Sequence, residues 1–498
     1  MSSATQRAAQ GAFAADFKRQ LALHAQSALH TQSAPDYASG FSAYVHIPFC
    51  TARCGYCDFN TYTNLDFGAG ASANNFAQTV LREIDFSAVA LRESAGKLRD
   101  SEKKLRDSAG VFGASEGAFN SAAGVLGDVA GVLGDTAGEA STPAEVVPST
   151  AAPLLTSVFF GGGTPTLLPA RDLVKILDHL RATYGIRPDA EITVEANPES
   201  VNRESLAELK RGGVNRVSFG MQSAAEPVLA VLQRQHTPGQ VRAVAQAARE
   251  LGLEFSVDLI YGTPGESLAD WRDSLAGAIA LHPVHISAYA LTVEPHTPMG
   301  RAIARGQIAE PDPDDQADKY ALADELLQAA GYEWYEISNW AQPGHESRHN
   351  LNYWRNGNWW GYGPGAHSHF SGMRWWNVKH PIKYAHMLSI VNEEETNSQF
   401  PLGKVAGGAA VQVLTESAAQ LPVSDGEILT SAEIREEHIM LGIRLREGIA
   451  VPEGIPEQVI SGLTVDGLLD PEQAAAGRLV LTLRGRLLAD VVTRALWG

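Results

Sequence analysis

The chain has 498 residues, and its 57 acidic and 39 basic side chains give a net charge of −18. This length predicts two or three domains, and a hydrophobic content of 44% allows each domain to bury a core, as in soluble globular proteins. The acidic balance argues against a general nucleic-acid interface, and no apolar run approaches the roughly 18 residues that a membrane span requires.

Residues 1–40 are rich in Ala, Ser and Gln and predict a flexible extension, with a helix near residues 13–29. From residue 41 to 300, short β-branched and aromatic runs alternate with amphipathic segments such as 170–185 and 238–252. This alternation predicts parallel β/α units, in a barrel or an open wound sheet, with ligands bound at the carboxyl ends of the strands. The expected strands are 42–47, 157–163, 191–197, 215–223, 254–262 and 284–291.

Residues 92–150 interrupt this alternation. From Leu91 the sequence repeats every seven residues, and glycine then recurs at the same spacing from Gly110 to Gly138. A heptad favours a coiled coil, but each glycine destabilises a helix by about 1 kcal/mol. The segment therefore predicts a low-complexity insertion that lies outside the barrel.

The β/α alternation stops near residue 300. Residues 301–390 predict an aromatic-rich α/β extension, with a helix and then a strand within 317–340, and residues 391–430 predict a loop. Residues 431–498 predict two helical pieces and a hairpin-like segment at 478–486, which together are winged-helix-like. This last region has seven basic and ten acidic residues, which argues against DNA binding.

All three cysteines, Cys50, Cys54 and Cys57, lie within eight positions directly after the first expected strand. So few thiols do not build a disulfide framework, and no secretory leader pattern precedes them, so a reducing cytoplasm is the expected compartment. Clustered thiolates select zinc or an iron–sulfur cluster. Zinc would need a fourth ligand, for which His46 is the nearby candidate, whereas a [4Fe–4S] cluster on three thiolates leaves one iron open to a non-protein ligand.

Five segments share their motifs with one known group of proteins: YVHIPFCTARCGYCDF (44–59), FFGGGTPTLL (159–168), VEANPE (194–199), VSFGMQS (217–223) and VDLIYGTPGES (257–267). Together they resemble the radical S-adenosylmethionine (SAM) superfamily, in the branch of oxygen-independent coproporphyrinogen III oxidases and their haem-chaperone relatives. The resemblance implies an incomplete parallel (β/α)6 barrel at 41–300, whose open face is covered by the C-terminal domain. It also implies a [4Fe–4S] cluster on the three cysteines, whose open iron binds the amino and carboxylate groups of SAM.

The resemblance carries further residues into the cofactor site. Gly162, Gly163 and Thr164 match the turn that binds the SAM amino group, and glycine there lets backbone amides approach a ligand closely. Glu195 follows on the next strand, where a carboxylate suits the ribose hydroxyls or the ammonium of SAM, and Tyr44 is a further implied contact.

A second SAM site is implied by the oxidase branch. The residues that match its positions are Tyr56, Gln222, Arg234 and Asp258. Arg234 is equally compatible with a structural ion pair to a neighbouring carboxylate, whereas Asp258 stands at the end of an expected strand, where ligand-binding residues gather.

Two features favour the chaperone branch over the oxidase. The oxidase carries a further cysteine where this chain has Phe59, and HNLNYW (349–354) resembles the H-N-x-x-Y-W motif of the chaperones. Five of the nine tryptophans lie in 354–376 near His367, so flat rings and a neutral imidazole, His349 above all, could enclose and ligate haem. The alternatives are that the tryptophans form the core of a small domain and that His367 lies near SAM.

The sequence therefore predicts a cytoplasmic haem chaperone of the radical SAM type, which binds a [4Fe–4S] cluster, SAM and haem and delivers haem to an acceptor such as a respiratory haem protein. An electron donor such as flavodoxin or ferredoxin and a peripheral membrane contact are compatible with this function, and no nucleic-acid partner is expected. Two alternatives are the oxidase itself, which decarboxylates porphyrinogen propionates in porphyrin biosynthesis through a SAM-derived radical, and a zinc-stabilised binding protein.

Overall fold

The computed structural model describes residue 17 and residues 40–68, 70–91, 154–389 and 421–497. Apart from Phe17 and Gly40, the expected N-terminal extension lies outside these ranges. The insertion at 92–150 and residues 391–420 of the expected loop also lie outside them. Within the described ranges, no helix combines the length and the apolar character that crossing a membrane requires.

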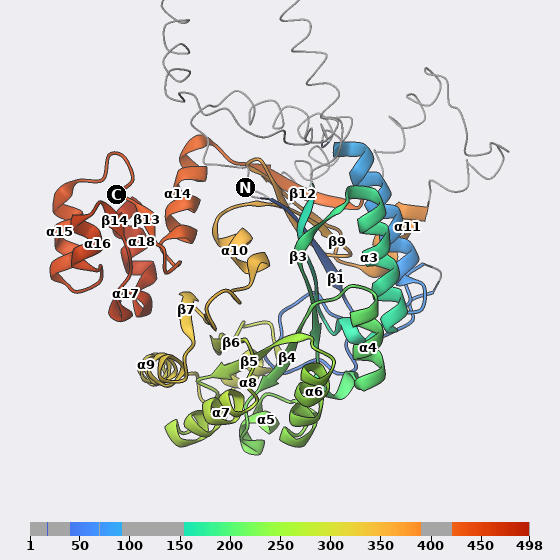
Figure 1. The fold of residues 1–498 in the computed structure, drawn as a ribbon, viewed down its shortest axis with the longest axis horizontal. Helices are drawn as coiled ribbons and strands as arrows, with labels where there is room; N and C mark the ends of the chain where they lie inside the picture. The colour runs from blue at the N-terminus through green and yellow to red at the C-terminus, as the bar shows by residue number, and fades with distance from the viewer. Residues whose placement is uncertain (1–16, 18–39, 69, 92–153, 390–420, 498) are drawn as a thin grey trace, which may run out of the picture.

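Six parallel strands form the wall of an incomplete barrel and follow one another in chain order, which confirms the expected (β/α)6 arrangement (Figure 1). Their side chains alternate between the two faces. On one of them, Val217, Phe219 and Met221 are buried against the outer helices, whereas Arg216 and Ser218 face the interior. The strands are β1 Phe41–Ile47, β2 Leu155–Gly162, β3 Ile186–Ala196, β4 Arg216–Gln222, β5 Glu254–Tyr261 and β6 His285–Ala290.

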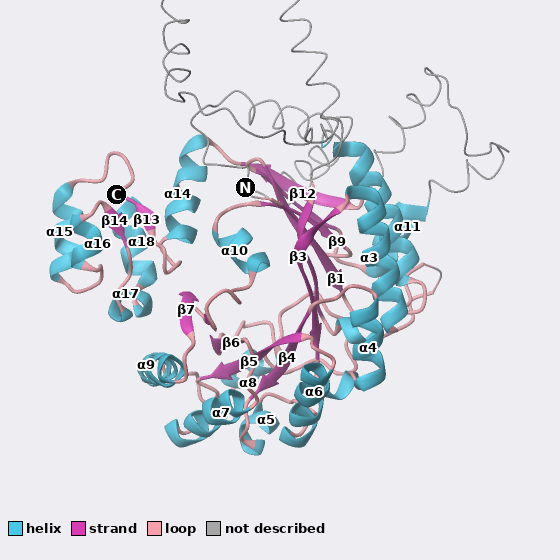
Figure 2. Ribbon diagram, in the orientation of Figure 1, coloured by secondary structure: helices cyan, strands magenta, loops and turns pink. Residues whose placement is uncertain are grey.

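Helices cover the outer side of these strands, as Figure 2 shows. Reciprocal side-chain caps fix where two of them begin, through Thr237 with Gln240 and Ser267 with Asp270. The segments expected at 170–185 and 238–252 are confirmed as helices α3 and α6. A helix at 76–91 is followed by α3 Ala170–Tyr184, α4 Arg203–Arg211, α5 Glu226–Val231, α6 Pro238–Glu250, α7 Leu268–Ala280 and α8 Pro298–Ala304, with short 3-10 turns at Pro165–Leu167 and Pro198–Ser200.

The sheet continues beyond the barrel at both edges. The added strands are β9 Asn358–Tyr362, β10 His367–Phe370, β11 Met373–Asn377 and β12 Val423–Ile428 beside β1, and β8 Asn339–Ala341 and β7 Glu333–Glu336 beside β6. The helices of this region are α9 Pro313–Ala329, α10 Arg348–Trp354 and α11 Pro381–Ser389. Trp360 and Trp375 are each 1% exposed, and their rings meet edge to face with centroids 4.9 Å apart. These two tryptophans therefore belong to the hydrophobic core, which was the alternative to haem contact.

Strand β12 corrects part of the loop expected at 391–430. It pairs antiparallel with β11, where Met373 lies opposite Ile428 and Trp376 opposite Asp425. Its sequence, VSDGEI, is rich in residues that are rare in strands, so local propensity could not reveal it. The hydrogen bonds of its neighbour, rather than its own side chains, make this segment a strand.

The C-terminal region also differs in detail from its expected winged-helix-like form. It contains five helices instead of two: α14 Ser431–Gly442, α15 Glu457–Val465, α16 Pro471–Ala475, α17 Leu483–Leu487 and α18 Ala489–Trp497. The hairpin expected at 478–486 is wrong. Strand β14 (Arg478–Leu479) pairs with the distant β13 (Ile449–Ala450), and the hydroxyl of Thr482 accepts a hydrogen bond from the Gly485 N–H, which begins α17.

Helix α10, rather than the C-terminal domain, lies at the open side of the barrel (Figure 1). Ser347, His349, Asn350 and Tyr353 from this helix and its cap line the interior, and none of the described residues after Tyr353 does so. The C-terminal domain packs behind α10 through α14, because the α10 segment already occupies the position that the domain was expected to cover.

A buried ion pair joins the C-terminal domain to the rest of the molecule. Arg486 donates two hydrogen bonds to Asp324 of α9, at 2.8 and 2.6 Å, and its guanidinium lies 4.4 Å from the ring centre of Trp334. Burial alone would raise the pKa of Asp324, but the hydrogen bonds and charge of Arg486 lower it below its ordinary value. The stability that this pair contributes is therefore present above the unfolded pKa of Asp324 and is lost as the pH falls toward its folded pKa.

We expect Arg486→Met to destabilise the protein by about 3–5 kcal/mol, because it leaves the buried Asp324 carboxylate without its cationic partner, with only the hydrogen bonds from Trp340 and Gln328 remaining. Urea denaturation at pH 7 measures this loss. The matched control is Arg355→Met, which breaks an equally bidentate pair with Glu447 whose side chains are each 46% exposed, and should cost less than about 1 kcal/mol. Equal losses in the two variants would contradict the role given to burial.

Candidate functional site

A cavity of about 670 Å³ occupies the barrel interior, between the cysteine loop and α10. Thirteen residues that the sequence analysis proposed for the metal and cofactor sites line it, although they are scattered over more than 300 positions of the chain, whereas the two further candidates His46 and His367 do not. The thirteen residues are Tyr44, Cys50, Cys54, Tyr56, Cys57, Gly162, Gly163, Thr164, Glu195, Gln222, Arg234, Asp258 and His349.

The cysteine loop leaves β1 and is held at its return. The Cys50 N–H donates to the Tyr62 carbonyl at 3.0 Å, and the Asn60 amide donates to the carbonyls of Pro364 and Lys379, both at 2.8 Å. Burial raises the pKa of the Cys50 thiol to about 11, partly offset by the Thr164 hydroxyl. Among the described residues, no group of three or more His, Cys, Asp or Glu side chains is already arranged to hold a metal ion.

His46 does not supply a fourth ligand beside the cysteines. Its Nδ1 is hydrogen-bonded to the Tyr44 hydroxyl at 3.1 Å and its Nε2 to the Asn60 carbonyl at 3.0 Å. Both ring nitrogens are thus engaged, and His46 does not line the cavity. The Cys3His zinc interpretation therefore loses its fourth ligand, and the donor set suits a group that takes three thiolates and a further ligand from the cavity.

The glycine turn after β2 uses its amides within the protein, contrary to the expectation that they approach a ligand. The Gly163 N–H donates to the Ile47 carbonyl at 2.7 Å and the Thr164 N–H to the Phe49 carbonyl at 2.8 Å, while the Gly162 N–H donates to Glu195 at 3.2 Å. These bonds join the turn to the start of the cysteine loop. A Cβ atom on Gly163 would lie 2.4 Å from the Phe49 oxygen, so glycine is required for this close approach.

Two half-buried carboxyl groups, Glu195 and Asp258, face the cavity, and no cationic side chain among the described residues lies within 4 Å of either. Burial, reinforced by the nearby charge of Asp258, raises the pKa of Glu195 to about 8. Burial likewise raises the pKa of Asp258, although the hydroxyls of Ser287 and Ser218, each at 2.8 Å, counteract it. Both groups are therefore poised to accept a cation or a hydroxyl donor from a ligand.

Arg234 forms no ion pair within 4 Å among the described residues, so its alternative assignment as a structural ion pair is wrong. Its guanidinium donates to the Asn197 side-chain oxygen at 2.6 Å and to the Gly220 carbonyl at 3.2 Å, and it lies 3.6 Å from the Cys54 sulfur. Gln222 projects from the same wall, with a positive φ of 63°. Tyr56 lines the cavity from the cysteine loop, and burial raises the pKa of its phenol.

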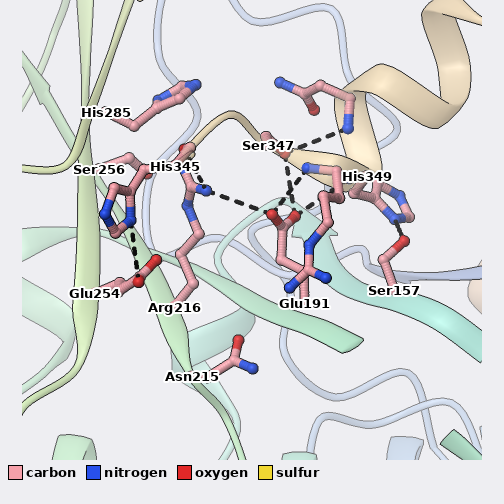
Figure 3. A network of polar contacts seen from close by, with 12 residues as sticks. Ser157, Glu191, Asn215, Arg216, Glu254, Ser256, His285, His345, Ser347 and His349 are labelled. Carbon is pink, nitrogen blue, oxygen red and sulfur yellow. Dashed lines mark hydrogen bonds and ion pairs between the residues drawn. The ribbon is translucent and has the colours of Figure 1, made fainter. Parts of the chain in front are cut away.

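The helix that carries the HNxxYW motif begins on one carboxylate, Glu191 of β3 (Figure 3). Glu191 accepts hydrogen bonds from the Ser347 hydroxyl at 3.1 Å and from the backbone N–H groups of Arg348 and His349 at 2.9 and 3.3 Å. Arg216 contacts it from the other side at 3.4 Å. These contacts complement the positive end of the helix and fix where His349 lies.

His349 is fully hydrogen-bonded in this cavity. Its Nδ1 is bonded to the Ser157 hydroxyl and its Nε2 to the Tyr353 hydroxyl, both at 2.8 Å, and its ring stacks on Phe159. Burial lowers its pKa to about 3, so the imidazole is neutral. His367, in contrast, is exposed on β10, stacks on Trp376 and does not line the cavity, so its expected place near SAM is not found.

Several cavity residues were missed, among them Arg216, Ser256 and His285, which lie outside the quoted motifs, and Ser218, which lies within VSFGMQS but was not singled out. Their spacing in the sequence could have revealed them. Arg216 and Ser218 precede Gln222 on β4, and Ser256 precedes Asp258 on β5, by an even number of positions, so they lie on the same face of their strand. His285 occupies an inward position of the next strand, β6. The period of two along β4 and β5 would have placed Arg216, Ser218 and Ser256 on the cavity face.

We expect Gly163→Ala to displace the Phe49 carbonyl and with it Cys50. The overpacking should cost about 1–3 kcal/mol in thermal or urea denaturation and should lower the iron retained after anaerobic reconstitution. Gly462→Ala on the exposed face of α15 is the control, since among the described residues no atom beyond its chain neighbours and its own helix backbone lies within 4 Å of the added methyl group. Unchanged stability and iron content in Gly163→Ala would contradict the close approach.

The raised pKa of Glu195 predicts a pH-dependent effect on stability. Between about pH 4.5 and 8 the folded protein keeps a proton on Glu195 that the unfolded chain releases, so this group lowers stability by up to about 1.4 kcal/mol per pH unit. Glu195→Gln has no titrating group at this position and therefore no such loss. Its free energy of unfolding relative to that of wild type should rise from pH 5 to 8 and then level off. Urea midpoints measure it, with Glu204→Gln on the exposed face of α4 as control, and a constant difference would refute the assignment.

Comparison with known proteins identifies the family. The radical SAM superfamily profile matches residues 142–276. The chain is 38% identical to the heme chaperone HemW of Mycobacterium tuberculosis over 93% of this chain and 97% of that protein. It is 29% identical to the heme chaperone HemW of Bacillus subtilis, over 92% and 99%, and 34% identical to that of Escherichia coli, over 66% and 69%.

Among solved structures, coproporphyrinogen III oxidase (HemN) from Escherichia coli, described as a radical SAM enzyme, has a TM-score of 0.64 at 18% identity, over 93% of this chain and 91% of that one. This likeness shows a shared fold. Taken with the near full-length match to relatives of 38% identity, it shows that the chain belongs to the HemW family within the radical SAM superfamily.

Proposed function

We propose that the protein binds a [4Fe–4S] cluster, SAM and haem in the cytoplasm and delivers the haem to an acceptor haem protein, such as one of the respiratory chain. The observation that carries this proposal is that the three cysteines and His349 line the same cavity. A cluster and a haem held by these residues would be close enough for each to influence the other. An electron donor such as flavodoxin or ferredoxin would serve the cluster.

Cys50, Cys54 and Cys57 would hold the cluster, which when bound supplies reducing electrons and one iron open to SAM. Arg234 lies 3.6 Å from the Cys54 sulfur and the Thr164 hydroxyl 3.8 Å from that of Cys50, so both can donate to thiolates. Burial and the charge of Asp258 raise the pKa of Glu195 to about 8, and an ammonium bound beside it would favour its ionised form. The carboxylate would thereby recognise the cationic end of SAM.

Haem would lie against α10 and its aromatic neighbours. The neutral imidazole of His349 has the protonation state that an iron ligand needs, but one of its hydrogen bonds, to Ser157 or to Tyr353, has to open first. Tyr353 meets Trp359 at 4.6 Å, so flat rings continue from the cavity toward β9. An exchange between hydrogen bond and iron bond suits a protein that must release its haem again.

Phe59 favours the chaperone over the coproporphyrinogen III oxidase. It stands where the oxidase resemblance places a further cysteine, lines the same cavity and is 62% exposed. An apolar side chain at this position offers no thiol beside the cluster site. Oxidase activity is therefore the competing outcome of the experiment below.

We expect His349→Ala to weaken haem binding at least roughly tenfold, as loss of an axial ligand requires, in titrations of the Soret band on anaerobically reconstituted protein. His367→Ala is the control, because His367 lies outside the cavity. A parallel sample receives SAM, reductant and coproporphyrinogen III. Many turnovers of decarboxylated product together with loose haem binding would overturn the chaperone proposal in favour of the oxidase.

A further inference from the structure

Among the described residues of β3, β4 and β6, three buried side-chain N or O atoms that face the barrel interior have no hydrogen-bond partner. They are Arg216 Nη2, His285 Nδ1 and Thr193 Oγ1. Their residues are 3%, 2% and 2% exposed, and all three line the cavity. An unsatisfied buried polar group costs about 1–3 kcal/mol, so three on one wall indicate a site that a ligand completes.

The strand register places these residues on one inward-facing arc. Thr193 of β3 is paired with Arg216 of β4, and Ser256 of β5 is paired with His285 of β6. Ser218 lies between them, opposite Ser256. Figure 3 shows Arg216 extending from its strand toward the segment before α10, with Ser256 and His285 beside it. The three donors thus come from three of four adjacent strands.

The groups around the arc make it a donor site. The Tyr335 hydroxyl accepts from the Ser347 N–H at 3.4 Å and is hydrogen-bonded to His285 Nε2 at 2.8 Å. In the tautomer in which this hydroxyl donates to Nε2, the ring hydrogen of the neutral His285 lies on Nδ1, where it can be donated to a ligand. Arg216 Nη1 is used by Glu191 and by the His345 carbonyl, but Nη2 remains. A water molecule accepts only two hydrogen bonds and must donate two, whereas a carboxylate accepts four and donates none.

We propose that Thr193, Arg216 and His285 form a subsite for a carboxylate at this end of the cavity. Arginine suits a carboxylate through its planar donors and permanent charge. The subsite adjoins α10, since Arg216 and the His349 N–H both contact Glu191. The carboxylate is a propionate of the haem bound at His349, which rests on the proposed function, or a small free carboxylate.

The test compares haem with haem dimethyl ester, which keeps the ring and iron but has no free carboxylate, in Soret titrations of the reconstituted full-length protein. We expect wild type to bind the ester roughly tenfold more weakly than haem. In Thr193→Val, which is nearly isosteric, and in Arg216→Gln, this difference should shrink to about twofold or less. Arg203→Gln on the exposed face of α4 makes the same charge change outside the cavity and should keep the wild-type difference.

A second arm identifies the source of the carboxylate. Sodium acetate is compared with sodium chloride at equal ionic strength for its effect on the melting temperature of wild type and Thr193→Val. Stabilisation of wild type alone, with haem and its ester bound equally, assigns the subsite to a free carboxylate. If neither the ester nor acetate distinguishes wild type from the variants, the proposal is overturned. If wild type binds no haem, the proposed function is contradicted. The comparison of acetate with chloride then still tests whether the subsite binds a carboxylate.

Discussion

The carboxylate of Glu191 is the contact on which the closure of the barrel depends. Six strands leave the cavity open on one side, and α10 is held at that side by Glu191, which accepts its first N–H groups and the Ser347 hydroxyl, together with the contacts of His349 to Ser157 and Phe159. Arg216 shares the same carboxylate, so one side chain of β3 ties a neighbouring strand to the helix that carries His349. Without this contact α10, which has only seven residues, would be only marginally stable as a helix.

The cavity combines opposite electrostatic preferences along its length. Near the cysteine loop it offers carboxyl groups with raised pKa values, Glu195 and Asp258, which favour a cationic ligand. Toward the amino-terminal ends of the strands it offers Arg216 and unpartnered donors, which favour an anion. The cavity can therefore orient one ligand that carries both charges, or two ligands of opposite charge. The low dielectric of the interior strengthens both electrostatic interactions.

Much of this fold follows from local sequence, because the six strands are rich in buried β-branched and aromatic residues, and three of the helices between them, α4, α6 and α7, begin with reciprocal side-chain caps. The cofactor residues could be grouped because they belong to motifs at strand ends, and the register brings them to one cavity. What could not be predicted depends on partners distant in the chain. Strand β12 exists through β11, Thr482 begins a helix where a hairpin was expected, and the amides of Gly163 and Thr164 bond to the cysteine loop instead of a ligand. Arg216 and Glu191 carry no motif, and their roles arise only when β3, β4 and α10 meet.

The position of β1 in the sheet has a consequence for how the chain is made. Phe41 pairs with Leu155 on one side and with Asn358 on the other, and Asn60 in the cysteine loop bonds to the Pro364 and Lys379 carbonyls. During synthesis one edge of this strand therefore stays unpaired until the ribosome has added some 300 further residues. Such an edge invites pairing with other chains, and the native loop forms only after that wait. A cluster held by this loop, as proposed, would therefore be inserted after most of translation. A fragment that ends near residue 300 retains the cysteines without the strand and carbonyls that hold their loop.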